Sequence, residues 1–136
     1  MDFTLLSRWQ PQLLAALRIM TALLFMQHGL IKLFGFPPGG QPGVQQVGTL
    51  LWIGGVIELV TSVLLVLGLF TRLAAFVAAG EMAVAYFMFH APKGFYPAVN
   101  MGEGAILFCF IFLYLAAAGP GAWSVDGARF RSRMPR

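Results

Sequence analysis

Four long apolar runs, separated by short segments rich in glycine, proline or charge, organise this chain. They cover residues 13–33, 49–70, 73–89 and 105–118, the last extended back toward Met101. A helix needs roughly 20 mostly apolar residues to cross ~30 Å of hydrocarbon. The pattern therefore predicts an all-α fold with four transmembrane helices, at about residues 12–34, 48–69, 72–90 and 101–118, in one domain over residues 1–136.

The connecting segments limit how these helices are arranged. Pro11 suits the first turn of a helix, and Gly35 is expected to end the first run. The proline- and glycine-rich segment 35–48 is predicted to be an extracytoplasmic loop. Only residues 68–72 join the second run to the third, which makes those helices antiparallel neighbours. We expect a four-helix bundle with both termini on one side of the membrane.

The amino-acid composition indicates that this fold lies in a lipid membrane. Hydrophobic residues make up 59% of the chain and the mean hydropathy is +0.79, well above a soluble globular domain. The first run contains Arg18 and is too long for a cleaved signal peptide. We therefore predict a multi-pass protein of a bacterial inner membrane, in contact with the lipid bilayer. Despite the net charge of +4, no nucleic-acid partner is expected, because no soluble fold presents the basic residues.

Basic residues are distributed unequally between the two sides of the predicted bundle. The side with only Lys32 and Lys93 is expected to face outward, because basic residues concentrate on the cytoplasmic side of membrane proteins. Both termini are therefore predicted to be cytoplasmic. The basic residues of the terminal side are Arg8, Arg18, Arg72, Arg129, Arg131, Arg133 and Arg136.

Few charges occur within the apolar runs, and each of them needs an explanation. A charge at the centre of a membrane helix costs at least ~2.5–3.5 kcal/mol. Arg18 is predicted to pair with Glu58 or Glu81, which lie near the middle of the second and third helices. Such a pair either fixes helix register or forms the floor of a binding site. Two carboxyls around one arginine leave a surplus charge, so one of them is expected to take up a proton and could serve as a proton relay.

A second polar cluster is predicted at the outer rim. His28 and Lys32 share the helix face of Arg18 and converge there with Glu103. Three further residues, His90, Asn100 and Tyr114, are expected to line the same space. Although some of these are metal-ligand types, their spacing matches no metal motif, and neither a metal nor a haem is predicted. We interpret the primary set as ligand-binding or proton-relay residues, comprising Arg18, His28, Lys32, Glu58, Glu81 and Glu103.

The third helix also carries small residues at four-residue intervals. Ala75, Ala79 and Ala83 form a face that allows another backbone to approach closely. This face predicts either packing inside the bundle or a homodimer contact through the third helix.

The chain resembles the DoxX family of membrane proteins over most of its length. The matching segments are RIMTALLFMQHGLIKLFGF (18–36), GGVIELVTSVLLVLGLFTRLAA (54–75), HAPKGFY (90–96), Glu103 and GPGAWSVDG (119–127). The resemblance implies a four-helix bacterial inner-membrane protein linked to quinone or thiol redox metabolism. It also implies functional roles for Arg18, His28, Lys32, Glu58 and Glu103, whereas Glu81 is inferred from its depth.

The leading hypothesis is a membrane protein that binds a quinone or a similar apolar molecule as a subunit of a redox system, with a partner protein. Catalysis is unspecified, because no nucleophile–base motif is present and the single Cys109 excludes a paired-thiol mechanism within the chain. The chain is at most an accessory subunit of a quinone-linked oxidoreductase. The alternatives are a membrane scaffold or assembly factor, whose charges only specify packing, and a small proton-coupled transporter.

Overall fold

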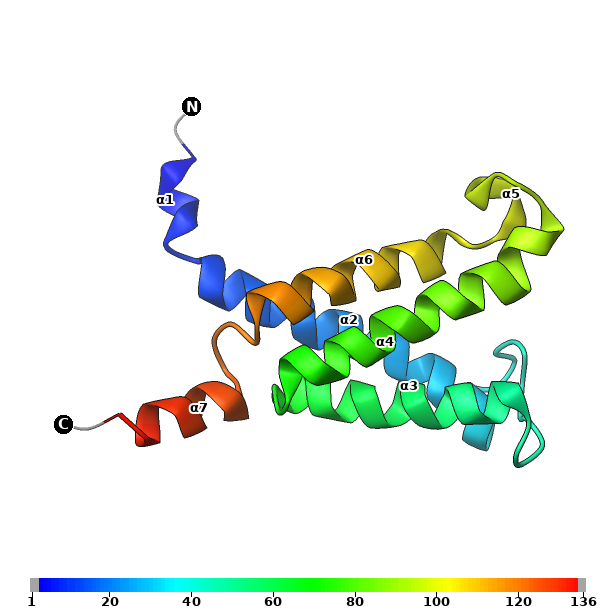
Figure 1. Ribbon diagram of the computed structural model, residues 1–136, viewed down its shortest axis with the longest axis horizontal. Helices are drawn as coiled ribbons and strands as arrows, with labels where there is room; N and C mark the ends of the chain where they lie inside the picture. Colours follow the sequence, from blue (N-terminus) through cyan, green and yellow to red (C-terminus); the bar gives the residue numbers. More distant parts are fainter. Residues whose placement is uncertain (1–2, 135–136) are drawn as a thin grey trace.

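Four long helices run side by side in the computed structural model, which describes residues 3–134 (Figure 1). The long helices are α2 (Gln10–Phe34), α3 (Leu50–Leu67), α4 (Thr71–Ala85) and α6 (Glu103–Ala118). The shorter elements are α1 (Thr4–Ser7), the π-helical turn η1 (Tyr86–His90), the 3-10 turn η2 (Ala91–Lys93), α5 (Pro97–Asn100) and α7 (Val125–Ser132). No β-strand occurs within residues 3–134. The predicted all-helical fold is confirmed.

The first and last described helices, α1 and α7, lie at the same end of the bundle (Figure 1). We call this the terminal end, and the opposite end, which carries the 35–49 loop and α5, the distal end. Residues 1, 2, 135 and 136 are not described, so Arg136, which was counted among the basic residues of the terminal side, lies outside the described part of the chain.

The ends of the long helices follow from local residues. Gly35 and Gly68 close α2 and α3 in the left-handed conformation, with φ of 71° and 65°, which glycine adopts without steric cost. Thr49 begins α3 by accepting a hydrogen bond from the Trp52 amide at 3.3 Å. The helix ends therefore fall within two residues of the predicted ones, with η1 continuing α4 to His90.

The helices α2 and α3 approach each other at two glycines. A Cβ atom on Gly29 would lie 2.8 Å from the Gly55 carbonyl oxygen and 2.9 Å from the Leu59 amide nitrogen. A Cβ on Gly55 would lie 2.9 Å from Lys32 Cβ. The backbones can approach this closely only because neither residue has a side chain. This contact fixes the register between α2 and α3.

The core lies between α4 and α6 and includes Phe25 of α2. Ala75 and Ala79 are 0% and 2% exposed in this core, where they pack inside the chain. They are therefore not available to a second copy, and the predicted homodimer contact through this face is wrong. Internal packing, the alternative reading of the small residues, is what the structure shows, with Ala83 half-buried beside them.

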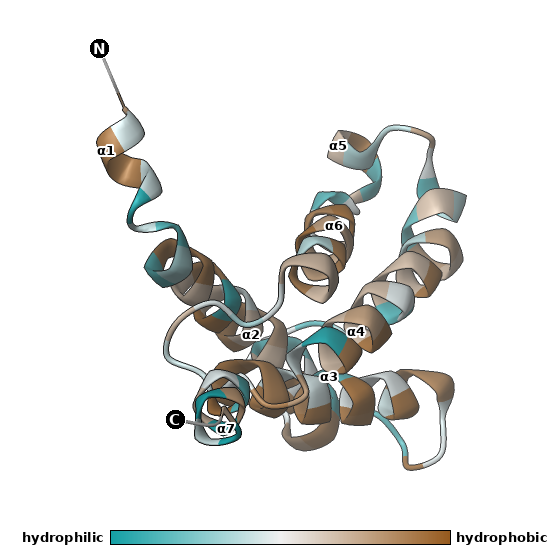
Figure 2. Ribbon diagram, turned by 60° about the vertical axis from the view of Figure 1, so that its left-hand side comes forward, coloured by the Kyte–Doolittle hydropathy of each residue, from teal (hydrophilic) through white to brown (hydrophobic). Residues whose placement is uncertain are grey.

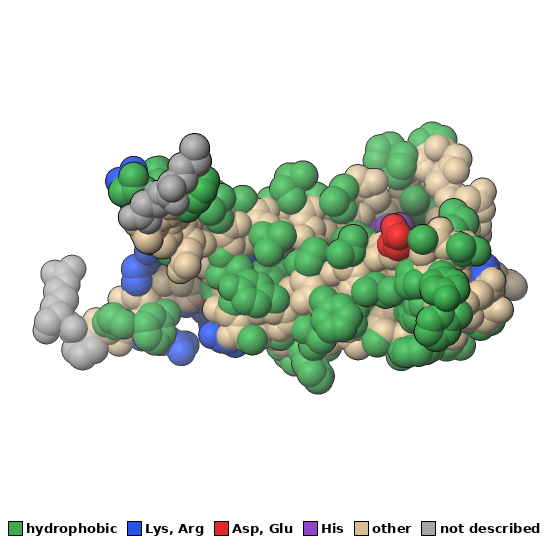
Figure 3. Space-filling model, turned by 90° about the horizontal axis from the view of Figure 1, so that it is seen from above, with side chains coloured by type: hydrophobic (Ala, Val, Ile, Leu, Met, Phe, Trp, Pro, Cys, Tyr) green, Lys and Arg blue, Asp and Glu red, His purple; other side chains and the backbone are tan. Residues whose placement is uncertain are grey.

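Hydrophobic residues make up most of the long helices (Figure 2), and apolar side chains cover much of the face seen in Figure 3, as expected for a protein in lipid. Phe76 of α4 and Phe110 of α6, for example, are 65% and 66% exposed. Three helical segments, Gln10–Phe34, Leu50–Leu67 and Thr71–Lys93, are long and apolar enough to span a membrane, whereas Glu103–Ala118 is shorter. The chain is a membrane protein with a helical, lipid-facing body.

At the terminal end of the bundle, charged side chains bind the backbone carbonyl and amide groups that are left free where helices end. Arg72 donates to the Ala116 carbonyl at 3.1 Å and also to the Ala117 carbonyl, at the C-terminus of α6. Asp126 accepts from the Phe70 and Thr71 amides, both at 2.9 Å, at the N-terminus of α4. Helix termini leave such backbone groups without partners of their own, and side chains of the right charge stabilise them.

These contacts also affect the acid–base behaviour of Asp126. Partial burial alone would raise the pKa of this carboxyl group. The hydrogen bonds from Thr71 and Phe70 and the nearby charge of Arg129 outweigh burial and hold the pKa of Asp126 below its ordinary value. The carboxylate is therefore the form that binds the start of α4.

Candidate functional site

A cavity of about 740 Å³ opens between α2, α3, α4 and α6 toward the distal end. Gln41 of the 35–49 loop and His90 of η1 are among its lining residues, which places its mouth at that end. Most of its wall is apolar, with a small set of polar groups on one side, as is typical of small-molecule sites. The polar or charged lining residues are His28, Lys32, Gln41, Glu58, Glu81, His90 and Lys93.

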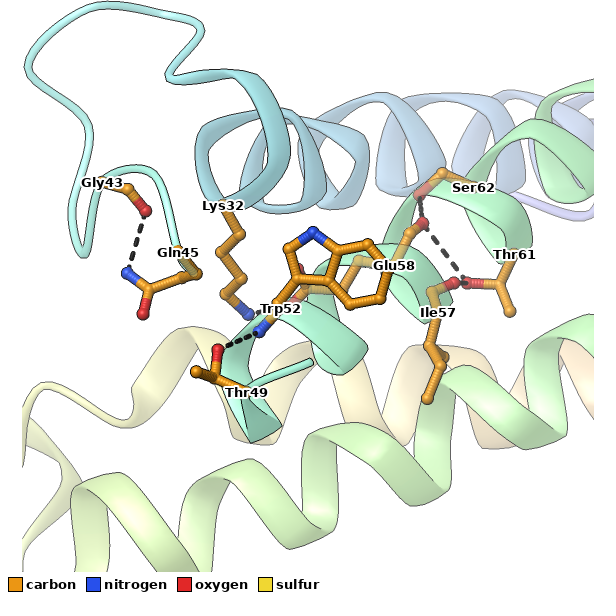
Figure 4. Close-up of polar contacts among 9 residues, drawn as sticks. All are labelled: Lys32, Gly43, Gln45, Thr49, Trp52, Ile57, Glu58, Thr61 and Ser62. Atoms are coloured by element: carbon orange, nitrogen blue, oxygen red, sulfur yellow. Dashed lines mark hydrogen bonds and ion pairs between the residues drawn. The ribbon is translucent and has the colours of Figure 1, made fainter. Parts of the chain in front are cut away.

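The strongest polar contact of the cavity joins α2 to α3. Lys32 Nζ lies 2.6 Å from Glu58 Oε1, and Figure 4 shows the lysine side chain extending from α2 to α3. Helical side chains lean toward the N-terminus of their helix, so Lys32, near the distal end of α2, points back into the bundle. Glu58 is 1% exposed. The ammonium group therefore compensates a carboxylate that lipid could not solvate.

Glu81 of α4 completes a triad with this pair. Its carboxyl group lies beside that of Glu58, and both feel the charge of Lys32. Glu58 Oε2 and Glu81 Oε2 are buried and accept no hydrogen bond from any other described residue. Two ionised carboxyls beside one ammonium would carry a net negative charge, which is costly at this depth in the membrane. With one proton on the pair of carboxyls the triad has no net charge.

Gly54 of α3 makes room for the third member of the triad. A Cβ atom at Gly54 would lie 3.1 Å from Glu81 Oε1 and 3.8 Å from Lys32 Nζ. The bare backbone of Gly54 thus leaves room for the Glu81 carboxyl to lie against α3, with the Lys32 ammonium close by. The sequence signal for this glycine is the Gly54–Gly55 pair, one turn before Glu58.

An aromatic layer closes the cavity toward the terminal end. Phe108 lines the cavity, and its ring lies 5.9 Å from that of His28, in an edge-on contact. Below it, Phe25 and Phe112 are fully buried, with ring centroids 4.8 Å apart. The cavity therefore has a polar side wall and an aromatic floor.

Asn100 holds the second segment of the distal end, residues 94–102, in place. This fully buried side chain donates to the Gly94 carbonyl at 2.9 Å and to the Tyr86 hydroxyl at 3.2 Å, and it accepts from the Gly102 amide at 2.8 Å. His90 Nδ1 lies 3.1 Å from the Asn100 carbonyl oxygen. His90 therefore lines the cavity as predicted, whereas Asn100 organises the loop behind it and is not part of the cavity wall.

Two other predicted residues lie elsewhere. Glu103 begins α6 with an exposed side chain and does not line the cavity. Tyr114 is 58% exposed on the outside of α6 and also lies away from the cavity. The predicted outer cluster is therefore reduced to His28, Lys32 and His90, because the rotation of α6 turns its polar residues outward.

Arg18 does not pair with Glu58 or Glu81, so that part of the prediction is wrong. The guanidinium is fully buried near the terminal end, where its hydrogen bonds within residues 3–134 go to backbone carbonyls and the charge of Asp126 lies close. It donates to Leu65 at 2.8 Å, to Trp123 at 2.8 Å, to Ala122 at 3.2 Å and to Pro120. Fourteen residues of helix separate Arg18 from Lys32, or ~21 Å. The lysine takes the place by the carboxyls that was predicted for the arginine.

Comparison with known proteins agrees with the membrane fold. The family model named DoxX matches residues 13–91. An uncharacterized protein of Haemophilus influenzae is 46% identical over 130 residues, which cover 93% of this chain and 97% of the relative. An uncharacterized membrane protein of Mycobacterium tuberculosis is 27% identical over 132 residues, covering 85% of this chain and 80% of the relative. No solved structure matches.

The matched region contains most of α2 and all of α3 and α4, and with them His28, the triad and Gly54. Together with the extent of the similarity to the Haemophilus protein, this match identifies the family. The chain belongs to the DoxX family.

Proposed function

We propose that this protein binds an elongated apolar molecule with a polar ring, of the quinone class, in the cavity at the distal end. The observation that carries the proposal is the cavity itself, about 740 Å³ of mostly apolar wall with Lys32, Glu58 and Glu81 on one side. An isoprenoid or alkyl tail would lie along the apolar wall. The ring would lie over Phe108, within reach of the triad.

The chain's own residues define what such a ligand would experience. Lys32 supplies an ammonium donor, and the two glutamates supply a proton that can be held or given up next to the ligand. The aromatic floor of Phe25, Phe108 and Phe112 separates the site from the terminal end. A quinone, when bound, supplies the electron-accepting chemistry. The role we propose is that of a ligand-binding subunit for a partner protein of a membrane redox system.

We further propose that all four long helices span a bacterial inner membrane, with both termini in the cytoplasm. The helix α6 packs along α4 over its length, which supports a fourth, shorter span. Arg8, Arg129, Arg131 and Arg133 support the orientation, since they belong to the terminal end, where two other arginines, Arg18 and Arg72, bind backbone carbonyls. The cavity would then open toward the outer face.

Occupancy of the cavity is tested by filling it from α6. Gly104 lines the cavity, and a Cβ there would meet no atom within 4 Å. Gly104→Phe places a ring in the cavity, whereas Gly104→Ala is the matched control. Binding of a short-chain alkyl benzoquinone to protein in nanodiscs, followed by tryptophan fluorescence, should weaken at least ~10-fold in Gly104→Phe, a loss of about 1.4 kcal/mol. Equal binding by both variants would remove the cavity as the site and leave the scaffold alternative.

A further inference from the structure

A second cavity, of about 280 Å³, lies at the terminal end, where α7 meets the turn between α3 and α4. Its lining residues are Phe70, Asp126, Arg129, Phe130 and Arg133. Arg129 and Arg133 are four residues apart, which places them on one face of α7 and its C-terminal cap. Two cationic groups therefore share this cavity.

Only one carboxylate of the cavity opposes the two arginines, and it already has partners. Asp126 accepts from the Phe70 amide with one oxygen and from the Thr71 amide with the other, both at 2.9 Å. Within residues 3–134, the side chains of Arg129 and Arg133 donate no hydrogen bond and form no ion pair. The Arg129 guanidinium lies over the Phe70 ring, 5.8 Å from its centroid. The cavity thus has an excess of positive charge, and both guanidinium groups keep their donors for a ligand.

The position of the cavity indicates which anion it takes. Phe70 directly precedes the segment Thr71–Lys93, which is long and apolar enough to span a membrane, so the cavity lies at the edge of the lipid-facing surface. Phe70 and Phe130 are 56% and 64% exposed beside the arginines. A guanidinium can bind two phosphate oxygens at once through its planar fork. A free phosphate ion gains nothing from the exposed rings, whereas the phosphate of a phospholipid is joined to apolar chains that can cover them.

We infer that this terminal cavity binds an anionic phospholipid, with Arg129 and Arg133 on its phosphate and Phe70 and Phe130 against its glycerol and the start of its acyl chains. A headgroup of net negative charge is preferred, because a zwitterionic headgroup brings its own cation toward the arginines. The site is separate from the distal cavity and independent of the function proposed for it. Its ligand holds α7, which lies beyond the ends of the long helices and buries none of its residues, at the bilayer surface (Figure 1).

Energy transfer from tryptophan to labelled lipid tests the site. The protein is placed in phosphatidylcholine nanodiscs, and phosphatidylglycerol or phosphatidylcholine with a dansyl group on the acyl chain is titrated in. Trp123, 66% exposed and two residues before α7, serves as a donor close to the cavity. Wild-type protein should bind labelled phosphatidylglycerol at least ~5-fold more tightly than labelled phosphatidylcholine, the factor expected for one basic residue near anionic lipid.

Two double variants locate the preference. Arg129→Gln with Arg133→Gln removes both cations of the cavity and should make the two labelled lipids bind equally. Arg8→Gln with Arg131→Gln is the matched control, because it removes the same charge from the terminal end at positions that do not line the cavity. This control should keep the preference. All four arginines are exposed, so both double variants should retain the helical circular dichroism of wild type.

Each outcome bears on the site alone and leaves the distal cavity untouched. A preference lost only in Arg129→Gln with Arg133→Gln supports the inference. Equal binding of the two lipids by wild-type protein overturns it, and so does an equal loss in both double variants, which would show attraction to the basic surface as a whole. Displacement of the labelled lipid by inorganic phosphate at constant ionic strength would overturn the assignment to a phospholipid.

Discussion

Lys32 and Arg18 lie on one face of α2 and solve the same problem in different ways. Each is a cation in an apolar helix, and each needs partners that lipid cannot provide. Arg18 spreads its planar guanidinium over carbonyls from two segments, Leu65 and residues 120–123. Lys32 instead places a single ammonium against Glu58 at 2.6 Å. The arginine thus links α2 to two backbone segments, whereas the lysine neutralises carboxyl groups beside a cavity.

The first prediction concerns Lys32→Met. This change leaves two buried carboxyls without their cation, a loss that typically costs about 3–5 kcal/mol. We expect a large fall in the melting temperature of protein in mild detergent. Adding Glu58→Gln removes the uncompensated negative charge and should restore part of the loss. Wild-type stability in Lys32→Met alone would show that the pair is not formed.

At the scale of the helices, the α2–α3 contact determines where the triad lies. Gly29 and Gly55 bring the two backbones together, and Lys32 lies about one turn beyond Gly29. The cavity-lining Gly54 and Glu58 are one turn apart on α3. A shift of α2 along α3 would separate Lys32 from Glu58. The two glycines are therefore as important to the site as its charged residues.

The second prediction follows from this contact. Gly29→Ala places a methyl group 2.8 Å from the Gly55 carbonyl oxygen, so the backbones must move apart. Overpacking of this kind costs about 1–3 kcal/mol, and we expect a lower melting temperature and weaker binding of the benzoquinone probe. Gly104→Ala, which adds the same methyl in open space, is the control. A Gly29→Ala variant as stable as this control would contradict the close approach.

The third prediction concerns the cap of α4 by Asp126. Because the pKa of this group is lowered in the folded state, its contribution to stability is complete at neutral pH. The contribution declines as pH falls below about 4, where the unfolded chain takes up a proton first, and it vanishes below the folded pKa. Asp126→Asn should therefore be less stable than wild type at pH 7, and the two should converge in acid. Denaturant unfolding as a function of pH measures this difference, and a gap that is independent of pH would contradict the cap.

At the scale of the whole molecule, three layers follow one another along the bundle. The Arg18 contacts hold the terminal end together, the rings of Phe25, Phe108 and Phe112 form the middle, and the cavity with its triad occupies the distal end. The cavity is therefore closed toward the terminal end, which carries most of the arginines. In the orientation that we propose, the ligand site is accessible from the outer half of the membrane.

The fourth prediction tests that orientation. In a Cys109→Ala background, Val47→Cys in the 35–49 loop should react with a membrane-impermeant maleimide on intact spheroplasts. Ser132→Cys in α7 should react only after the membrane is opened. Both positions are exposed in the structure, so accessibility alone does not distinguish them. Labelling of Ser132→Cys in intact spheroplasts would reverse the proposed topology.

The sequence predicts the elements of this molecule better than its contacts. The apolar runs and the glycines at their ends predict the ends of the long helices within two residues, counting η1 as part of α4. The estimated depth of each residue in the membrane correctly predicts that Glu58 and Glu81 lie close together. Depth alone could not select between Arg18 and Lys32 as their partner. Three of the four carbonyls that bind Arg18 belong to residues more than 100 positions away, at Pro120, Ala122 and Trp123. The rotation that exposes Glu103 and Tyr114 likewise depends on the packing of α6 against α4.

The central claim is that the distal cavity holds an apolar ligand of the quinone class, and mass spectrometry of the organic extract tests it most directly. Wild-type protein, Gly104→Ala and Gly104→Phe would be purified in mild detergent beside an unrelated four-helix membrane protein. We predict a quinone-class molecule near one per chain in the first two samples and its depletion in Gly104→Phe. Extracts that contain only bulk lipid, identical in all samples, would contradict the claim and favour a scaffold whose buried charges serve packing alone.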